Sequence, residues 1–322
     1  MPLFRHMMDN KRKYTQFCQS ARLPLHMQPW WLDAVCTGGS WDVSLAFDAE
    51  GRICGALPYY LTRAFGLQFI KMPPLTDYIG PWIQPAENRI AKQERLYAYE
   101  KQVITDLVEG LPNVHFFNQQ YYSSFTNWLP FYWKGYRQTT YYTYIIDNLT
   151  NLDAIYEGFK NTVRTDIKKA ENQVNIVTGD NPGPIYQLHP QRDFAVSREV
   201  FNRLDQALAQ RNQRRIFLAQ DYHTGEDIAG LYVTWDHHTA YFMLAAIKET
   251  RRQSAALHLL YWEAIRQMAG LVQQIDLCGS ILPGPERFSR SLGARQAPHF
   301  RVYKTGNNFL KIISLLLKKG YD

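Results

Sequence analysis

The stretch 214–247, RRIFLAQDYHTGEDIAGLYVTWDHHTAYFMLAAI, decides the fold. Apolar residues alternate within it and polar turns interrupt it, a pattern typical of three successive half-buried strands. We predict these strands at 214–223, 227–235 and 239–247. The order of elements predicts an α/β (α+β) domain with a central mixed, largely antiparallel sheet. The elements expected downstream are a helix at 254–270, a buried strand at 272–280, a short helix at 283–293 and a strand at 297–304.

The same layout occurs once more, near the start of the chain. The segment 44–61, SLAFDAEGRICGALPYYL, resembles 217–235, FLAQDYHTGEDIAGLYVTW, and hairpin turns easily absorb the longer turn of the second copy. We therefore predict two tandem halves, 1–148 and 149–322, with a substrate cleft between them. The matching positions are Leu45 with Leu218, Ala46 with Ala219, Asp48 with Asp221, Gly51 with Gly225, Ile53 with Ile228 and Gly55 with Gly230.

The composition describes a folded chain that favours an anionic partner. Hydrophobic residues make up 46% of the 322 residues and charged residues 20%, which excludes general disorder. The net charge of +7 favours a phosphorylated cofactor, a nucleotide-linked substrate, tRNA or a membrane surface. No secretory signal and no apolar run of about 18 residues occurs, so we expect a cytoplasmic protein. We expect the apolar tail 307–322 to cap its own domain; the alternative is peripheral contact with a membrane or partner.

Metal and disulfide chemistry is not indicated. The four cysteines are scattered, without the spacing of a disulfide framework or a zinc site. The adjacent His237 and His238 read as turn residues, since neighbouring side chains on a strand cannot readily reach one metal ion. We predict no metal site.

Basic residues form a row on the predicted helix 159–171. Lys160, Arg164 and Lys168 recur every four residues beside an apolar face, and Lys169 adjoins them. No acidic residue lies within this row to neutralise it. The row could hold a phosphate or carboxylate of a substrate, although a solvated helix face explains it equally well.

The junction between the predicted strand 239–247 and the following helix also carries positive charge. Arg251 and Arg252 lie there, and Ser254 is the predicted N-cap of the helix. The amide N–H groups and the positive dipole end of a helix attract anions. We therefore predict that this junction binds the anionic part of a cofactor.

Two further sets of residues are candidates for the site. Asp276, Cys278 and Ser280 alternate along one face of the predicted strand 272–280, where Asp276 could act as a base and Cys278 reads as a small strand residue. The loop 73–83, PPLTDYIGPWI, carries Tyr78, and loops of this kind often hold binding groups. A loop packed by its own Tyr78 and Trp82 is the structural alternative.

Taken together, four segments resemble the GNAT-like superfamily of Fem-type peptidoglycan aminoacyl transferases, and related GNAT-like acyltransferases of polysaccharide synthesis. They are NTVRTDIKKAE (161–171), IAGLYVTWDHHTAYFMLAAI (228–247), SAALHLLYWEAI (254–265) and IDLCGSILPGPERFSRSLGA (275–294). The resemblance covers residues 28–305 and implies two tandem GNAT-like (acyl-CoA N-acyltransferase) domains. It implies that Arg164, Lys168 and Lys169 contact an anionic substrate and that residues 276–280 line the cleft. The coiled-coil arm that Fem-type enzymes commonly insert for tRNA is absent from the sequence.

The resemblance implies N-acyl transfer. We predict that an acyl or aminoacyl group passes from acyl-CoA or aminoacyl-tRNA, neither held as a tightly bound cofactor, to an amine of a cell-envelope or polysaccharide precursor. Asp276 is the expected proton acceptor, and positioning is the expected source of rate enhancement. One alternative is a non-catalytic GNAT-fold protein that binds an anionic saccharide or nucleotide-linked ligand. Another is an RNA-binding protein, against which the lack of an RNA-binding motif counts.

Overall fold

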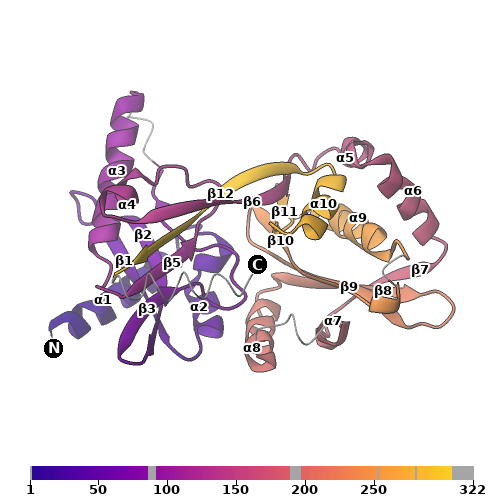
Figure 1. Ribbon diagram of the computed structural model, residues 1–322, viewed down its shortest axis with the longest axis horizontal. Helices are drawn as coiled ribbons and strands as arrows, with labels where there is room; N and C mark the ends of the chain where they lie inside the picture. The colour runs from indigo at the N-terminus through magenta and orange to yellow at the C-terminus, as the bar shows by residue number, and fades with distance from the viewer. Residues whose placement is uncertain (1, 86–91, 189–196, 252–253, 280, 307–322) are drawn as a thin grey trace. The chain divides into compact units, whose positions relative to one another are not determined.

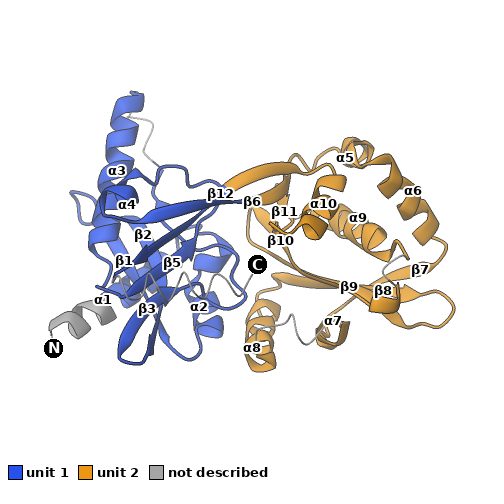
Figure 2. Ribbon diagram, in the orientation of Figure 1, with its two compact units in different colours: residues 1–141, 299–322 blue, residues 142–298 orange. Residues whose placement is uncertain are grey.

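The computed structural model describes residues 2–85, 92–188, 197–251, 254–279 and 281–306, and for residues 2–9 it describes the backbone alone. The chain divides into two compact units (Figure 2). Unit 1 comprises residues 1–141 and 299–322, and unit 2 comprises residues 142–298. The boundary that the sequence predicts, 148/149, divides the chain only once, whereas here the chain returns to unit 1 at His299.

Unit 1 is built around an antiparallel meander followed by a helix and a parallel strand. Strands β1 and β2 pair, β2 pairs with β3, and β5 then pairs with β3 in parallel. The strand order in this unit is β1-β2-β3-β5-β12, with β4 paired to β2. Its elements are α1 (Pro2–Phe17), η1 (Leu25–Met27), α2 (Pro29–Val35), β1 (Ser40–Phe47), β2 (Ile53–Ala64), β3 (Leu67–Lys71), β4 (Trp82–Ile83), α3 (Gln93–Glu109), β5 (Phe116–Gln120) and α4 (Leu129–Trp133). Strands β6 (Arg137–Ile146) and β12 (Arg295–Thr305) have residues in both units.

Unit 2 repeats this order of elements (Figure 1). Strands β8, β9 and β10 form an antiparallel meander, helix α9 follows, and β11 then pairs with β10 in parallel. The strand order is β6-β11-β10-β9-β8-β7. The elements of unit 2 are α5 (Leu152–Gly158), α6 (Asn161–Ala170), β7 (Val174–Gly179), α7 (Gly183–Leu188), α8 (Arg198–Ala209), β8 (Arg214–Asp221), β9 (Asp227–Trp235), β10 (Thr239–Ile247), η2 (Glu249–Arg251), α9 (Ala256–Met268), β11 (Gln274–Asp276) and α10 (Pro283–Ser291).

Helices cover both faces of the sheet in unit 2. On one face, Leu231 and Val233 of β9 pack in the core formed with α6 and α9. On the other face, the ring of Tyr232 lies 5.4 Å from that of Phe201 on α8. Strand β9 is therefore buried on both faces. This explains why eight of its nine residues are apolar or small.

The repeat that the sequence predicts is confirmed in the topology. The hairpin 44–61 forms β1 and β2, and 217–235 forms β8 and β9. The matched glycines of the two hairpins have the same packing role. A Cβ on Gly55 would lie 2.5 Å from a Val103 methyl group, and one on Gly230 would lie 2.4 Å from an Ile185 methyl group. Both glycines let a helical side chain approach a strand closely.

The sequence missed some elements between the two copies. Strand β7, which pairs with β8 in antiparallel fashion, was not predicted. Helix α8 begins at Arg198, with Ser197 as its N-cap. The tail 307–322, which was predicted to cap its own domain, lies outside the described residues. Among the helices that the structure describes, none has the length and apolar character needed to cross a bilayer.

Candidate functional site

The sheet of unit 2 opens between β10 and β11. Only Thr239, Ala240 and Tyr241 of β10 pair with β11, which ends at Asp276. Strand β10 continues to Ile247 and keeps its pairing with β9 on the other side. From Phe242 onward, therefore, the edge of β10 on the β11 side has no partner strand within the described residues.

A β-bulge lies at the start of this opening. The register between β10 and β9 shifts between Phe242 and Leu244, so that Met243 is the extra residue. Residues 243–245 are half-buried, although β10 lies in the interior of the strand order. A bulge redirects backbone groups and often occurs beside an active site. The opening therefore offers unpaired backbone donors and acceptors to an extended ligand.

A pocket lies where β10 passes into α9. Its volume is about 380 Å³, and its described lining comes from the turn after α6, the turn between β8 and β9, and Thr250, Arg251 and Ser254. Arg251 and Ser254, two of the residues predicted to bind a cofactor, both line it. Arg252 lies outside the described residues. The lining is completed by Gln173, Val174, Asp221, His223, Ile228 and Thr250.

Asp221 organises this pocket. One carboxylate oxygen accepts the backbone N–H groups of His223 and Thr224, at 3.1 and 3.0 Å. The other lies 3.1 Å from the Arg251 guanidinium, whose side chain is 41% exposed. The hydrogen bond from the Thr224 N–H, more than the ion pair, holds the pKa of Asp221 below its usual value. The carboxylate stays ionised and orients Arg251, and the ion pair uses only one of the five guanidinium N–H groups.

The predicted N-cap of the helix is wrong by one residue. Helix α9 begins at Ala256, and its N-cap is Ala255, which has a φ of 59° and provides no side-chain cap. The left-handed backbone at Ala255 shifts Ser254 out of capping geometry. The Ser254 hydroxyl oxygen is instead buried without a hydrogen-bond partner among the described residues. The pocket thus combines a guanidinium, an unused hydroxyl and an uncapped helix start, a donor set that fits an anion.

Comparison with known proteins identifies this region. Residues 186–299, which contain β8 to β11 and all residues of the β10–α9 pocket except Gln173 and Val174, match the family described as Acetyltransferase (GNAT) domain. The fold is GNAT-like. A search of curated proteins finds no match to the sequence.

Solved structures extend the GNAT-like fold over both halves of the chain. The FemX crystal structure aligns with a TM-score of 0.61 at 11% identity, covering 90% of this chain and 95% of FemX. A tandem GNAT protein from the clavulanic acid biosynthesis pathway gives 0.53 at 13% identity, with 92% and 94% covered. The L-PGS of Bacillus licheniformis gives 0.51 at 10% identity, with 89% and 91% covered. At these identities the likeness establishes the fold, and it agrees with the repeated topology.

In the GNAT-like domain of unit 2, Asp276 holds a turn. The predicted strand 272–280 is wrong beyond Asp276, because Cys278 has a φ of 50° and leaves the extended conformation. One oxygen of the buried Asp276 carboxylate accepts the Thr143 hydroxyl and, at 2.8 Å, the Cys278 N–H. Cys278 therefore does not share a strand face with Asp276, and Ser280 lies outside the described residues.

Glycine 279 fixes this turn against β6. A Cβ added to Gly279 would lie 2.6 Å from the Thr143 Cα, closer than side chains are found to backbone. The Gly279 N–H donates to the Thr143 hydroxyl at 3.0 Å. The turn that follows β11 is thus held by one threonine and one aspartate on adjacent strands, directly beside the opening of the sheet.

The predicted basic row begins at Lys160, the N-cap of α6, and continues along that helix; it lines neither the β10–α9 pocket nor the other pocket described below. Lys160, Lys168 and Lys169 are exposed, and the Arg164 guanidinium donates to Asn161 at 2.6 Å. Their substrate role stays a prediction. Tyr78 belongs to unit 1 and is only 3% exposed; its ring contacts those of His26, Tyr122 and His299.

Sequence reasoning did not single out a histidine–aspartate pair in unit 2. His258 Nδ1 of α9 lies 3.2 Å from an Asp166 oxygen of α6, and the imidazole stacks on Phe288 at 5.1 Å. Burial lowers the pKa of His258 more than Asp166 raises it. The two residues are far apart in the sequence, and no local motif connects them, so only the packing of α6 on α9 could reveal the pair.

Proposed function

We propose that the chain is an acyltransferase whose activated donor binds along β10 and at the β10–α9 pocket. The acyl or aminoacyl group would pass to an amine of a cell-envelope or polysaccharide precursor. The single observation that carries this proposal is that Arg251 and the buried Ser254 hydroxyl line a pocket just after β10, the strand whose edge opens beyond Tyr241. The GNAT match over residues 186–299 supports the reaction class.

The donor fits the residues that are present. Acyl-CoA carries a diphosphate, and Arg251, the Ser254 hydroxyl and the first N–H groups of α9 would bind it. The unpaired edge of β10 would hydrogen-bond the extended part of the donor and leave its carbonyl at the bulge. A backbone N–H there would stabilise the oxyanion of the tetrahedral intermediate.

The chemistry needs little beyond positioning. The amine attacks the activated carbonyl, the bond to the thiol or ester oxygen breaks, and the proton of the amine must leave. Holding both reactants together supplies a large part of the rate enhancement. We propose Asp276 as the proton acceptor, because it lies at the end of β11 beside the opening.

Replacing Arg251 with alanine tests the donor site. We expect the affinity for CoA to fall about tenfold, because a charge-assisted hydrogen bond contributes about 1.5–3 kcal/mol. Calorimetric titration with CoA and acetyl-CoA measures the change. Arg266→Ala is the matched control, since Arg266 also belongs to unit 2 but lies on α9 outside the pocket, is exposed and pairs with Glu263. Equal CoA affinity in wild type and Arg251→Ala would show that the donor does not bind at this pocket.

Titrations with aminoacyl-tRNA beside CoA distinguish the two possible donors from each other and acyl transfer from the rival function. Binding of aminoacyl-tRNA alone would identify an aminoacyl ester as the donor. A non-catalytic protein that binds an anionic saccharide or nucleotide-linked ligand at the same pocket is the second candidate, and Arg251 and the Ser254 hydroxyl would serve it equally well. Failure of CoA and charged tRNA to bind would support that candidate and contradict acyl transfer from either donor.

Asp276→Asn and Asp276→Ala separate chemistry from structure. Asparagine keeps an oxygen that accepts from Thr143 and Cys278, so we expect nearly unchanged stability but a transfer rate lowered about 10²-fold or more. Alanine leaves buried donors without a partner and should also cost about 1–3 kcal/mol of unfolding free energy. Thermal denaturation and steady-state rates are the measurements. If Asp276→Asn keeps its transfer activity, Asp276 is not the proton acceptor and only holds the turn.

A further inference from the structure

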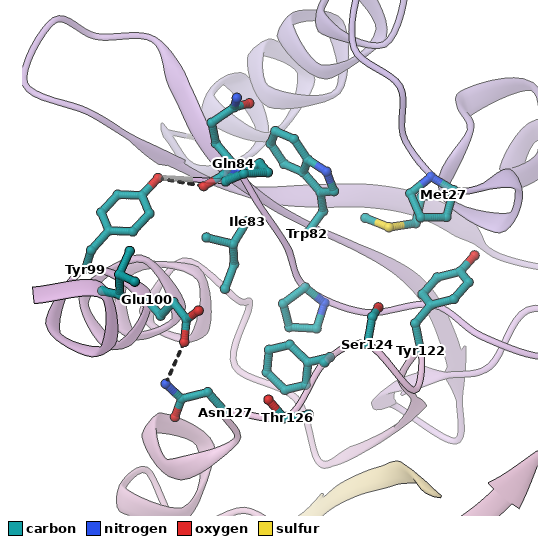
Figure 3. Close-up of a pocket in the computed structure, with 15 residues that line it drawn as sticks. Met27, Trp82, Ile83, Gln84, Tyr99, Glu100, Tyr122, Ser124, Thr126 and Asn127 are labelled. Atoms are coloured by element: carbon teal, nitrogen blue, oxygen red, sulfur yellow. Dashed lines mark hydrogen bonds between the residues drawn. The ribbon is translucent and has the colours of Figure 1, made fainter. Parts of the chain in front are cut away.

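A second pocket lies in unit 1, beside the connection from β3 to α3. Its volume is about 320 Å³, and its walls come from residues 81–85, from α3 and from residues 122–127 (Figure 3). These segments follow β3 and β5, which are the counterparts of β10 and β11 in the repeated topology. Ligands of α/β sheets bind outside the carboxyl ends of parallel strands. The position is therefore that of a binding site, although nothing in the acyl-transfer proposal uses it.

The charge of this pocket differs from that of the β10–α9 pocket. Among the described residues that line it, none is lysine, arginine or histidine, and Glu100 is the single charged side chain. In the pocket of unit 2, in contrast, the carboxylate of Asp221 is paired with Arg251. The chain as a whole carries a net charge of +7. A phosphate, nucleotide or carboxylate would meet a carboxylate in unit 1 without a neutralising cation, so the pocket disfavours anionic ligands.

The apolar part of the pocket consists of rings. Trp82, Tyr99 and Tyr122 line it, together with prolines and Phe125. Trp82 is half-buried, and its ring packs edge-on against Phe17 at 5.2 Å, which holds it in place. Tyr122 is backed by the buried Tyr78, at 5.3 Å between ring centroids. The negative faces of such rings attract the polarised C–H groups of a sugar ring.

The polar part of the pocket consists of planar amide and carboxylate groups. The Asn127 side-chain amide N–H donates to the Glu100 carboxylate at 3.1 Å. The Tyr99 hydroxyl donates to the backbone carbonyl of Gln84 at 3.2 Å (Figure 3). The first bond uses one of the two carboxylate oxygens and one of the two amide hydrogens. The second carboxylate oxygen, the other amide hydrogen and the exposed Gln84 amide can accept and donate to neighbouring hydroxyl groups.

We propose that this pocket of unit 1 binds a neutral saccharide. Rings on one side and paired amide and carboxylate groups on the other suit a ligand with an apolar ring face and hydroxyl groups at its edge. The volume lies at the lower end of the range of roughly 300–1,000 Å³ for small-ligand sites, so a single residue of a glycan fits better than a long chain. The binding does not depend on acyl transfer.

The test is ligand binding by the full chain without any acyl donor. Saturation-transfer NMR and calorimetry would use the methyl glycosides of glucose, galactose, mannose and N-acetylglucosamine at millimolar concentration. We expect at least one glycoside to bind saturably, with an affinity about tenfold weaker in Glu100→Ala and in Asn127→Ala. Glu109→Ala is the matched control, because Glu109 also lies on α3 but is exposed and pairs with Lys134.

The remaining outcomes are decisive. Arg251→Ala should bind the glycoside like wild type, so that failure of the donor site and failure of the sugar site can be told apart. Ethanolamine is the competing probe, since Glu100 could instead pair with an ammonium group. Binding of ethanolamine without any glycoside, or no binding of the four glycosides, would overturn the proposal. Glycoside binding that Glu100→Ala and Asn127→Ala leave unchanged would place the sugar elsewhere and overturn it as well.

Discussion

Asp205→Ala is expected to destabilise unit 2 by about 3 kcal/mol, because it leaves a buried guanidinium without its main counter-ion. The Arg214 side chain is only 7% exposed, and its Nε lies 2.6 Å from an Asp205 oxygen. The same carboxylate accepts the buried Tyr232 hydroxyl at 2.8 Å. Removing it therefore disrupts β8, β9 and α8 together. In a unit of this size the melting temperature should fall roughly 6–12 °C, as measured by calorimetry.

Asp180 provides the matched control for this prediction. Its carboxylate lies 3.0 Å from Nη1 of the same Arg214, but its side chain is 99% exposed. Exposed ion pairs contribute only about 0–1 kcal/mol, so Asp180→Ala should barely change the melting temperature. A loss of similar size in both variants would contradict the view that burial of the charge, rather than pairing alone, determines the cost.

Unit 1 should lose about 2 kcal/mol of stability for each of two buried histidines between neutral pH and about pH 5. Burial lowers the pKa of His299 to about 4 and that of His26 to about 3. Below about pH 6.5 the unfolded chain binds protons that the folded chain does not, so unfolding becomes easier as the pH falls. Both rings contact Tyr78, so charging them would also place two cations in one aromatic cluster.

Denaturant unfolding of wild type and His299→Gln at neutral and acidic pH measures this effect. The variant should lose about 2 kcal/mol less than wild type on acidification, because glutamine takes up no proton. Asp42 in unit 1 acts in the opposite direction, since burial raises its pKa to about 6 and its protonation favours the folded state as the pH falls. His237→Gln, in an exposed turn, is the control. Parallel pH profiles for His299→Gln and wild type would show that His299 does not contribute.

The sequence predicts elements whose formation is local and periodic. The strands and turns of 214–247, the repeated hairpin and the GNAT-like fold follow from alternation, from turn residues such as Gly51 with its φ of 76°, and from order along the chain. The junction that carries Arg251 and Ser254, both of which line a pocket, could be predicted because a strand-to-helix junction is itself a local feature.

The rest depends on contacts between distant segments. The end of β11 is set by Thr143, which binds Asp276 from another strand, so alternation alone extended the strand too far. Tyr78 was predicted either to bind a ligand or to pack its own loop, and its burial against His26 and His299, which lie far from it in the sequence, could not be read from the loop alone. The pocket of unit 1 joins residues 81–85 with 122–127, and no motif in either segment indicates the other. The proposed sugar site could not be predicted for this reason.

The return of the chain to unit 1 at His299 has a consequence for synthesis on the ribosome. Strand β12 pairs with β5 from Arg301 to Thr305. The sheet of unit 1 therefore cannot be completed until these residues are translated, after all of unit 2. Unit 2 is continuous, from Tyr142 to Pro298, and can fold as soon as it emerges. The half translated first is thus the half completed last, and until then the edge of β5 that β12 will cover is open to other strands.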